Sequence, residues 1–377
     1  MDVATKEHEA LAHRAALESM VLLKNNGILP LRLDDVHTVG VIGPNANSRS
    51  ALIGNYHGTA QRYVTVLEGL QEKLPQDVRV LYSQGCHLWK NNVEPLSKPS
   101  NSDRLAEAKT VCDYSDVVVL VVGLDETLEG EEGDTGNSDA SGDKKDLRFP
   151  GPQRELMKAV LDSGKPVIFV NMTGSAMDLK LADEKAAAIL QTWYPGALGG
   201  EDVADVLLGN ASPSGKLPVT FYEDTKDLPD FEDYSMKNRT YRYFTGTPQY
   251  AFGYGLSYTT FAVGKGKLSA KSMKKNGKVT LTVPVTNTGK RQGTETVQVY
   301  VKALNDPGAP IKALKGFQKL MLKPGETQKA VITLDSEAFE YYDEAIDELS
   351  PKAGSYQILY GTSSRDNDLQ ALNFTLK

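Results

Sequence analysis

The feature that most limits the fold of this chain is a regular alternation of apolar and amphipathic segments along residues 1–222. Between the apolar runs, apolar side chains recur at helical spacing, as in residues 103–111 and 152–162. Short apolar strands separated by helices are typical of a mostly parallel sheet that helices cover on both faces. We therefore predict an α/β domain over residues 1–222, with an opening helix at 7–24 and strands at 38–43, 78–82, 116–122, 166–170 and 187–192.

The pattern changes after Tyr222. Residues 223–261 are rich in Tyr, Asp, Gly and Pro and show little periodicity, which indicates a linker that crosses between domains. From residue 262 to 377 apolar and polar residues alternate with a period of two, and turn signals separate the runs. Such spacing predicts an all-β sandwich of immunoglobulin or fibronectin type III character, with strands at 279–285, 296–301, 329–334 and 355–360.

Charge and hydropathy exclude several classes of partner. The formal net charge is -7 and no cluster of Lys and Arg forms a basic stripe, so we expect no nucleic-acid partner. No apolar run approaches the roughly 20 residues that span a bilayer, so no membrane contact is expected. The first residues lack the pattern of a secretory signal. Cellular location stays open between the cytoplasm and, if a leader lies on a missing segment, the periplasm or the exterior.

A long acidic segment follows the strand predicted at 116–122. Residues 123–150 show no apolar periodicity, and carboxylates crowd their first third. Loops of this length inside a compact domain are uncommon unless they are functional. Carboxylates held close together raise one another's pKa, and a protonated carboxyl near neutral pH can act as a general acid. A solvated acidic loop is the plainer alternative. Parallel sheets bind ligands at the carboxyl ends of their strands, where this loop, Asn45, Asn171 and Trp193 would emerge.

Other chemistries do not fit the sequence. In the calcium-loop register that starts at Asn137, position twelve is Arg148, although a bidentate Glu is required there. His8 and His13 are five residues apart, whereas a zinc pair on one helical face needs four. Gly174-Ser-Ala lacks the second glycine of a serine nucleophile turn, and no His follows it. Nucleotide-binding glycine motifs are also missing. We therefore expect no metal and no cofactor.

Carboxylate chemistry remains, and hydrolysis of glycosides suits it. That reaction needs an acid that protonates the leaving oxygen and a second carboxylate that captures or stabilises the oxocarbenium centre. Trp193 and Tyr194 follow a predicted strand and could stack on the apolar face of a sugar ring, although packing in the core or at a domain interface is the alternative for aromatic residues.

Several motifs together resemble glycoside hydrolase family 3, which contains β-glucosidases and β-xylosidases. The resemblance covers nearly the whole chain, and the motifs nearest to the predicted β-sandwich are the most specific. They are ESMVLLKN at 18–25 with GILP at 27–30, VIGPNA at 41–46, WYPGALGG at 193–200, NASPSGKLPVTF at 210–221, RTYRYF at 239–244 and FGYGLSYTTF at 252–261.

The resemblance implies an (α/β)6 sandwich followed by a fibronectin type III-like domain. It also implies that a Glu on the long loop is the catalytic acid/base. The family's Glu-x-Glu pattern assigns this role to Glu131, with Glu129 and Glu132 as rivals. Asp125 and Asp134 are expected to tune or position the acid. The residues expected to contact substrate or an interface are Asn45, Asn55, Trp193 and Arg239.

The resemblance further implies that the nucleophile is an Asp on a (β/α)8 barrel, which normally precedes the segments seen here. A retaining mechanism needs its two carboxyls about 5 to 5.5 Å apart, so the acid alone is insufficient. We expect the substrate to be an oligosaccharide or an aryl β-glycoside and the barrel to come from a missing domain or another subunit. The alternatives are a non-catalytic carbohydrate-binding or interaction protein, and an inactive domain fragment.

Overall fold

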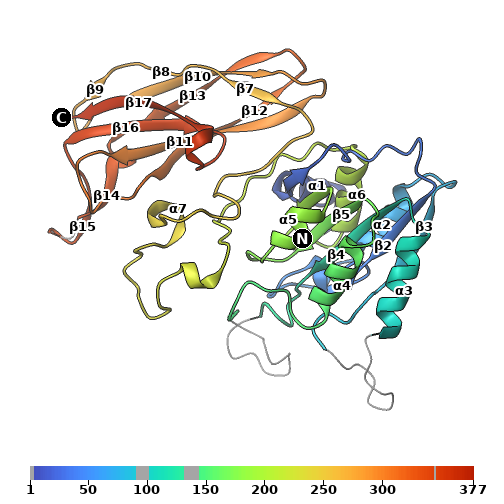
Figure 1. Ribbon diagram of the computed structural model, residues 1–377. Helices are drawn as coiled ribbons and strands as arrows, with labels where there is room; N and C mark the ends of the chain where they lie inside the picture. Colours follow the sequence, from blue (N-terminus) through green and yellow to red (C-terminus); the bar gives the residue numbers. More distant parts are fainter. Residues whose placement is uncertain (1–3, 91–101, 131–143, 344) are drawn as a thin grey trace. The chain divides into compact units, whose positions relative to one another are not determined.

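The computed structural model describes residues 4–90, 102–130, 144–343 and 345–377 (Figure 1). The chain forms two compact units: Met1–Gly215 with Glu223–Thr225, and Lys216–Tyr222 with Lys226–Lys377. Residues 216–222 belong to the second unit, where Phe221 pairs with Tyr250. The domain bounds at 222 and 261 expected from the sequence stay a prediction.

The first unit is built on a six-stranded sheet with the order β1-β6-β5-β4-β2-β3. Strands β2 to β6 pair in parallel, and β1 runs antiparallel to β6. This confirms the predicted mostly parallel sheet. The strands are β1 (Val21–Asn25), β2 (Thr38–Ile42), β3 (Arg79–Ser83), β4 (Val117–Gly123), β5 (Val167–Met172) and β6 (Ala188–Gln191).

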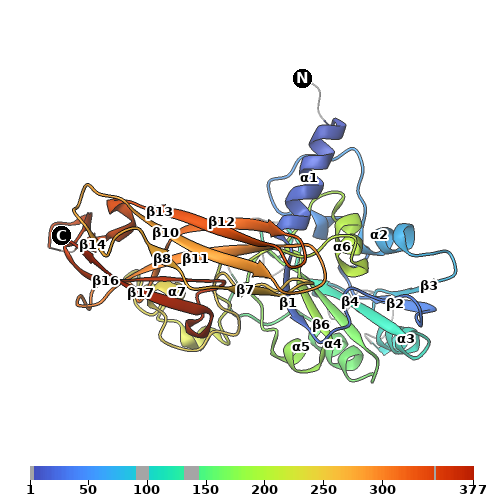
Figure 2. The same cartoon turned by 90° about the horizontal axis from the view of Figure 1, so that it is seen from above.

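Helices cover both faces of this sheet (Figure 2). One group consists of α1 (Lys6–Ser19), α2 (Val66–Lys73) and α6 (Gly199–Leu208), and the other of α3 (Ser102–Asp113), α4 (Gln153–Leu161) and α5 (Lys180–Lys185). In the first group α1 and α2 both contact α6, and in the second α3 and α5 both contact α4. In the part of the chain that the structure describes, no helix is both long and apolar enough to cross a bilayer.

The predicted opening helix at 7–24 is wrong in its last five residues, 20–24. Helix α1 starts at the N-cap Thr5, whose hydroxyl accepts from the backbone N–H of His8, and it ends at Ser19. Met20, Leu22 and Leu23 are all buried, and the chain there forms β1 against β6. A helix would expose part of this continuous apolar run, whereas an edge strand packed in the sheet buries it.

The second unit is a β-sandwich with the short helix α7 (Thr240–Tyr243) before it. One sheet has the order β13-β10-β7, with β8 also paired to β10, and the other has the order β12-β11-β16-β17-β9. The strands are β7 (Phe261–Val263), β8 (Lys267–Leu268), β9 (Ser272–Met273), β10 (Val279–Asn287), β11 (Gly293–Ala303), β12 (Ala313–Leu322), β13 (Thr327–Leu334), β14 (Glu340–Asp343), β15 (Glu348–Pro351), β16 (Gly354–Gly361) and β17 (Leu369–Leu376).

The core of the sandwich follows the predicted period of two. On β10, Val279, Leu281, Val283 and Val285 are buried, while the residues between them are partly exposed. The four predicted strands correspond to β10, β11, β13 and β16. The sequence did not predict β12, where Lys315 and Lys319 interrupt the apolar pattern; its pairing with β11 determines that strand.

Candidate functional site

The order of the strands creates a topological switch point at the carboxyl ends of β2 and β4. Strand β3, which follows β2 in the chain, lies on one side of β2, and the next strand, β4, lies on its other side. Open α/β sheets bind ligands at such a switch point. Gly43 and Gly123 lie at these strand ends with φ of 130° and 155°. A Cβ on either would lie 1.9 Å from a backbone carbonyl oxygen of the neighbouring strand, so the close approach of the backbones requires glycine.

Asn45 joins the segments that follow β2 and β4. Its side chain is 1% exposed, and its Nδ2 donates to the carbonyl oxygen of Leu124 at 2.8 Å. Its Oδ1 has no hydrogen-bond partner among the described residues. Asn171, at the end of β5, is also buried, and its Nδ2 donates to Thr173 Oγ1 at 3.1 Å and to Gln191 Oε1 at 2.5 Å. The carboxyl edge of the sheet is therefore lined by buried amides.

Asp125 shapes the first turn of the acidic segment. Its Oδ1 accepts from the backbone N–H of Thr127 at 2.9 Å and from the Thr127 hydroxyl at 2.6 Å. Its carbonyl oxygen accepts from the N–H groups of Leu128 and Glu129 at 3.0 and 2.9 Å. These bonds direct the chain from the end of β4 toward Glu129.

Three donors hold the Glu129 carboxylate. The backbone N–H of Gly174 donates to Oε2 at 2.7 Å, the Ser175 hydroxyl donates to Oε1, and the Tyr194 hydroxyl donates to Oε2. Burial, reinforced by the charge of Glu129, raises the pKa of Tyr194 well above its usual value, so this hydroxyl keeps its proton and remains a donor. Glu129 thus ties the acidic segment to the loops after β5 and β6.

Two glycines allow the backbone to lie close to the Tyr194 ring. A Cβ on Gly54 would lie 3.1 Å from that ring, and a Cβ on Gly174 would lie 3.0 Å from both the ring and Glu129 Oε2. From the sequence, one expected role of Tyr194 is to stack on a sugar ring. In the structure this ring contacts its own unit, and its hydroxyl is bonded to Glu129.

The other end of the acidic segment is fixed to the same loop. The Lys144 ammonium donates to the carbonyl oxygen of Ala176 at 2.6 Å and approaches Met177 Sδ at 3.2 Å. Burial lowers the pKa of Lys144, an effect that the charges of Glu129 and Asp146 oppose. Glu131, Glu132 and Asp134 lie between these two ends, outside the described residues.

Sequence reasoning missed a contact that involves Glu126. His57 Nε2 lies 2.8 Å from Glu126 Oε2. A hydrogen bond to the carbonyl oxygen of Gly58 and the bond to Glu126 raise the pKa of His57. The two residues are 69 positions apart, and no local pattern relates them. Across the described ranges, no three His, Cys, Asp or Glu side chains are grouped so that they could hold a metal ion.

The remaining candidates occupy separate settings. Asn55 Oδ1 accepts from the N–H of Tyr56 at 2.9 Å within a tight turn. Trp193 has a φ of 57°, and its indole N–H donates to the carbonyl oxygen of Ser19 at 3.0 Å, next to the end of α1. Arg239 belongs to the second unit, where its guanidinium donates to the carbonyl oxygens of Asp230 and Asp233. Their proposed contacts with substrate stay predictions.

Two domain families match the chain. Residues 20–258 match the glycosyl hydrolase family 3 C-terminal domain, and residues 295–364 match the fibronectin type III-like domain. Among curated relatives, a xylan 1,4-β-xylosidase of Xylanibacter ruminicola is 32% identical over 99% of this chain and 58% of its own length. A β-xylosidase of Formosa agariphila is 36% identical over 100% and 51%, and a periplasmic β-glucosidase of Salmonella typhimurium is 35% identical over 95% and 49%.

Solved structures agree with these matches. A β-glucosidase from Erythrobacter marinus superposes with a TM-score of 0.86 at 35% identity, covering 99% of this chain and 51% of that one. A family 3 β-glucosidase from Bifidobacterium adolescentis gives 0.84 at 33% identity, covering 100% and 54%. The chain thus spans about half the length of the relatives it matches. The resemblance seen in the motifs is confirmed, and the chain belongs to glycoside hydrolase family 3, whose C-terminal domain and fibronectin type III-like domain it contains.

Proposed function

We propose that this chain supplies the acid/base carboxyl of a retaining, exo-acting β-glycosidase that hydrolyses terminal β-linked sugars. The relatives named β-xylosidase and β-glucosidase suggest xylosides and glucosides as substrates. The nucleophile comes from a (β/α)8 barrel, as a further domain or a separate subunit. The observation that carries the proposal is the acidic segment, which leaves β4 at the switch point of the sheet and has both ends bound to the loop after β5.

Among the three candidate glutamates, the proposal assigns the reaction to Glu131. Glu129 accepts three hydrogen bonds from its own unit. A general acid has to carry a proton and hand it to substrate, whereas a carboxylate surrounded by donors is stabilised as an acceptor. This favours Glu129 as an anchor of the segment and leaves Glu131 and Glu132 for chemistry. In this proposal Asp125 positions the acid by directing the chain, and Asp134 tunes the acid through its charge.

The reaction proceeds in two steps. In the first, Glu131 donates its proton to the glycosidic oxygen as that bond to the anomeric carbon breaks, while the barrel carboxylate forms a bond to the same carbon. In the second, the Glu131 carboxylate takes a proton from water, whose oxygen attacks the anomeric carbon and displaces the nucleophile. The sugar leaves with retained configuration, and both carboxyls return to their starting states.

Turnover of p-nitrophenyl β-xyloside and β-glucoside tests this proposal. The chain alone is expected to be inactive, and activity is expected when the barrel-bearing polypeptide is added. Glu131→Gln should then lower kcat by about 100-fold or more on a phenyl glycoside, in line with the usual size of acid/base catalysis. The loss should be much smaller on a 2,4-dinitrophenyl glycoside, whose leaving group needs little protonation.

Matched variants decide between the three glutamates. If Glu132→Gln lowers kcat more on the phenyl than on the dinitrophenyl glycoside and Glu131→Gln does not, the acid/base is Glu132 and not Glu131. Turnover by the chain alone would contradict the proposed origin of the nucleophile. Sugar binding without turnover in the presence of the barrel would favour the non-catalytic alternative.

A further inference from the structure

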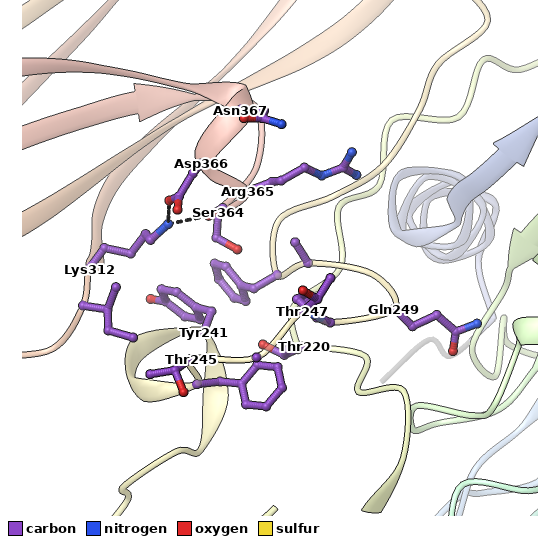
Figure 3. A pocket seen from close by; sticks show the side chains of 16 residues that line it. Thr220, Tyr241, Thr245, Thr247, Gln249, Lys312, Ser364, Arg365, Asp366 and Asn367 are labelled. Carbon is purple, nitrogen blue, oxygen red and sulfur yellow. Dashed lines mark hydrogen bonds and ion pairs between the residues drawn. The ribbon is translucent and has the colours of Figure 1, made fainter. Parts of the chain in front are cut away.

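The second unit contains a hollow of about 680 Å³ (Figure 3). All of its lining residues belong to this unit. They come from the end of the 216–222 stretch, from α7 and the following loop at 244–252, from residues 311–312 before β12, and from residues 364–367 before β17. A volume of this size is in the range of small-molecule binding sites.

Fixed aromatic rings form one part of the wall. Tyr241 stacks on Phe252 with ring centres 4.2 Å apart and an angle of 16° between the planes. The Tyr241 hydroxyl accepts from the backbone N–H of Leu314 at 2.9 Å, which fixes the ring. Phe244 packs edge-on against Tyr222 at 5.0 Å. Rings held in this way offer apolar surface without losing conformational entropy when a ligand binds.

The charged groups of the wall are engaged with protein partners. Lys312 is 6% exposed, and its ammonium donates to the carbonyl oxygen of Ser364 at 2.8 Å and to Asp366 (Figure 3). The Arg365 guanidinium lies 4.8 Å over the ring of Tyr254. Because Lys312 is paired with Asp366 and Arg365 lies 3.7 Å from Asp368, the hollow is poorly suited to a phosphate or a carboxylate.

Neutral polar groups complete the wall. Thr245, Thr247 and Asn367 are among the residues that line the hollow (Figure 3). Thr220 also lines it; this residue is 7% exposed, and its hydroxyl has no hydrogen-bond partner among the described residues. A buried hydroxyl that lacks a partner costs free energy, and a ligand with hydroxyl groups can supply the missing bond.

We propose that this hollow is an accessory site for a neutral carbohydrate, a short oligosaccharide of the kind that the enzyme degrades. Sugar rings present apolar C–H faces to aromatic side chains and hydroxyls to amides and threonines, and this wall offers both. The choice of sugar rests on the proposed function, whereas binding in this hollow requires neither the acidic segment nor the barrel.

Calorimetric titration of the full chain with xylobiose and with cellobiose tests the site, with glycerol as the control solute. Thr220→Val, which keeps the shape of the side chain, and Asn367→Ala should each weaken binding about two- to tenfold, the effect of one hydrogen bond. Asn276→Ala, in an exposed loop outside the hollow, should leave the affinity unchanged. Glu131→Gln should also leave it unchanged.

Three results would overturn the proposal. The first is no binding of either disaccharide by a chain that is folded by circular dichroism. The second is binding that Thr220→Val and Asn367→Ala leave intact while Glu131→Gln removes it, which would place the sugar at the acidic segment. The third is glycerol binding as tightly as the disaccharides. None of these results bears on the turnover test, so the two proposals can fail separately.

Discussion

At the scale of single residues, Glu129 and Tyr194 do most to organise the candidate site. Their bond joins positions 65 residues apart and connects the acidic segment with the loop after β6. Gly54 and Gly174 make room for the Tyr194 ring, so removal of its hydroxyl leaves a ring that still fits. Tyr194→Phe therefore isolates the hydrogen bond from the packing.

Tyr194→Phe is expected to lower the free energy of unfolding of the first unit by about 1.5 to 3 kcal/mol, because a hydrogen bond to a charged carboxylate has roughly that value. Urea unfolding followed by tryptophan fluorescence measures this, since Trp89 and Trp193 both lie in the first unit. In the complete enzyme the same variant should reduce kcat more on phenyl than on dinitrophenyl glycosides.

Tyr114→Phe is the matched control, because the Tyr114 side chain is 68% exposed. Equal unfolding free energies for the two variants would show that the bond between Tyr194 and Glu129 contributes nothing to stability. Equal losses of kcat on both substrates would show that it does not position the acid.

At the scale of elements, the contact between α1 and α6 contains a buried carboxyl. Asp202 on α6 is 2% exposed, and its Oδ1 lies 2.8 Å from Nδ1 of His13 on α1. Burial raises the pKa of Asp202 to about 6, although His13 opposes the shift. The folded state thus holds this proton more tightly than the unfolded state, in which an Asp has a pKa of about 3.9. Its contribution to stability is present below about pH 4 and is lost as the pH rises to about 6.

Asp202→Asn is expected to remove this pH dependence while keeping an oxygen that accepts from His13. The variant should gain stability relative to the parent as the pH rises from about 4 to about 6, by on the order of 1 to 3 kcal/mol. Unfolding free energies across that range measure the difference. Asp77→Asn, at an exposed position, is the control. Parallel curves for the parent and Asp202→Asn would contradict the raised pKa.

The elements also differ in how far local pattern predicts them. Strands β2, β4, β5 and β6 are continuous apolar runs, and period or composition is enough to find them. Strand β1 has the same character, yet it follows α1 so closely that the sequence predicted one long helix. Its partner β6 lies far along the chain, and only the sheet order reveals the pairing.

At the scale of the whole molecule, each of the two compact units has its own buried apolar residues. Leu190 on β6 lies in the first, and Leu281 on β10 lies in the second, and both are fully buried. The two Trp residues report on the first unit alone. Each core can therefore be perturbed and observed independently.

Leu281→Ala is expected to cost about 2 to 5 kcal/mol, as deletion of a fully buried leucine side chain usually does. The loss should appear in the unfolding of the second unit, followed by circular dichroism of its strands, with a smaller change in the tryptophan transition. Leu190→Ala should shift mainly the tryptophan transition of the first unit, with a smaller change in the unfolding of the second unit. Equal shifts of both signals in both variants would mean that the two units unfold as one cooperative body.

The sequence by itself determined the classes of structure: a mostly parallel α/β domain, a β-sandwich, and the family to which the motifs point. These follow from periodicity and short motifs, which are local properties of the chain. Only the tertiary structure decided that Asn45 bonds to Leu124, that Glu129 bonds to Tyr194, and that His57 meets Glu126. The physical reason is that such pairs depend on which strands become neighbours, and strand order is set by the packing of the whole sheet, which no local pattern contains.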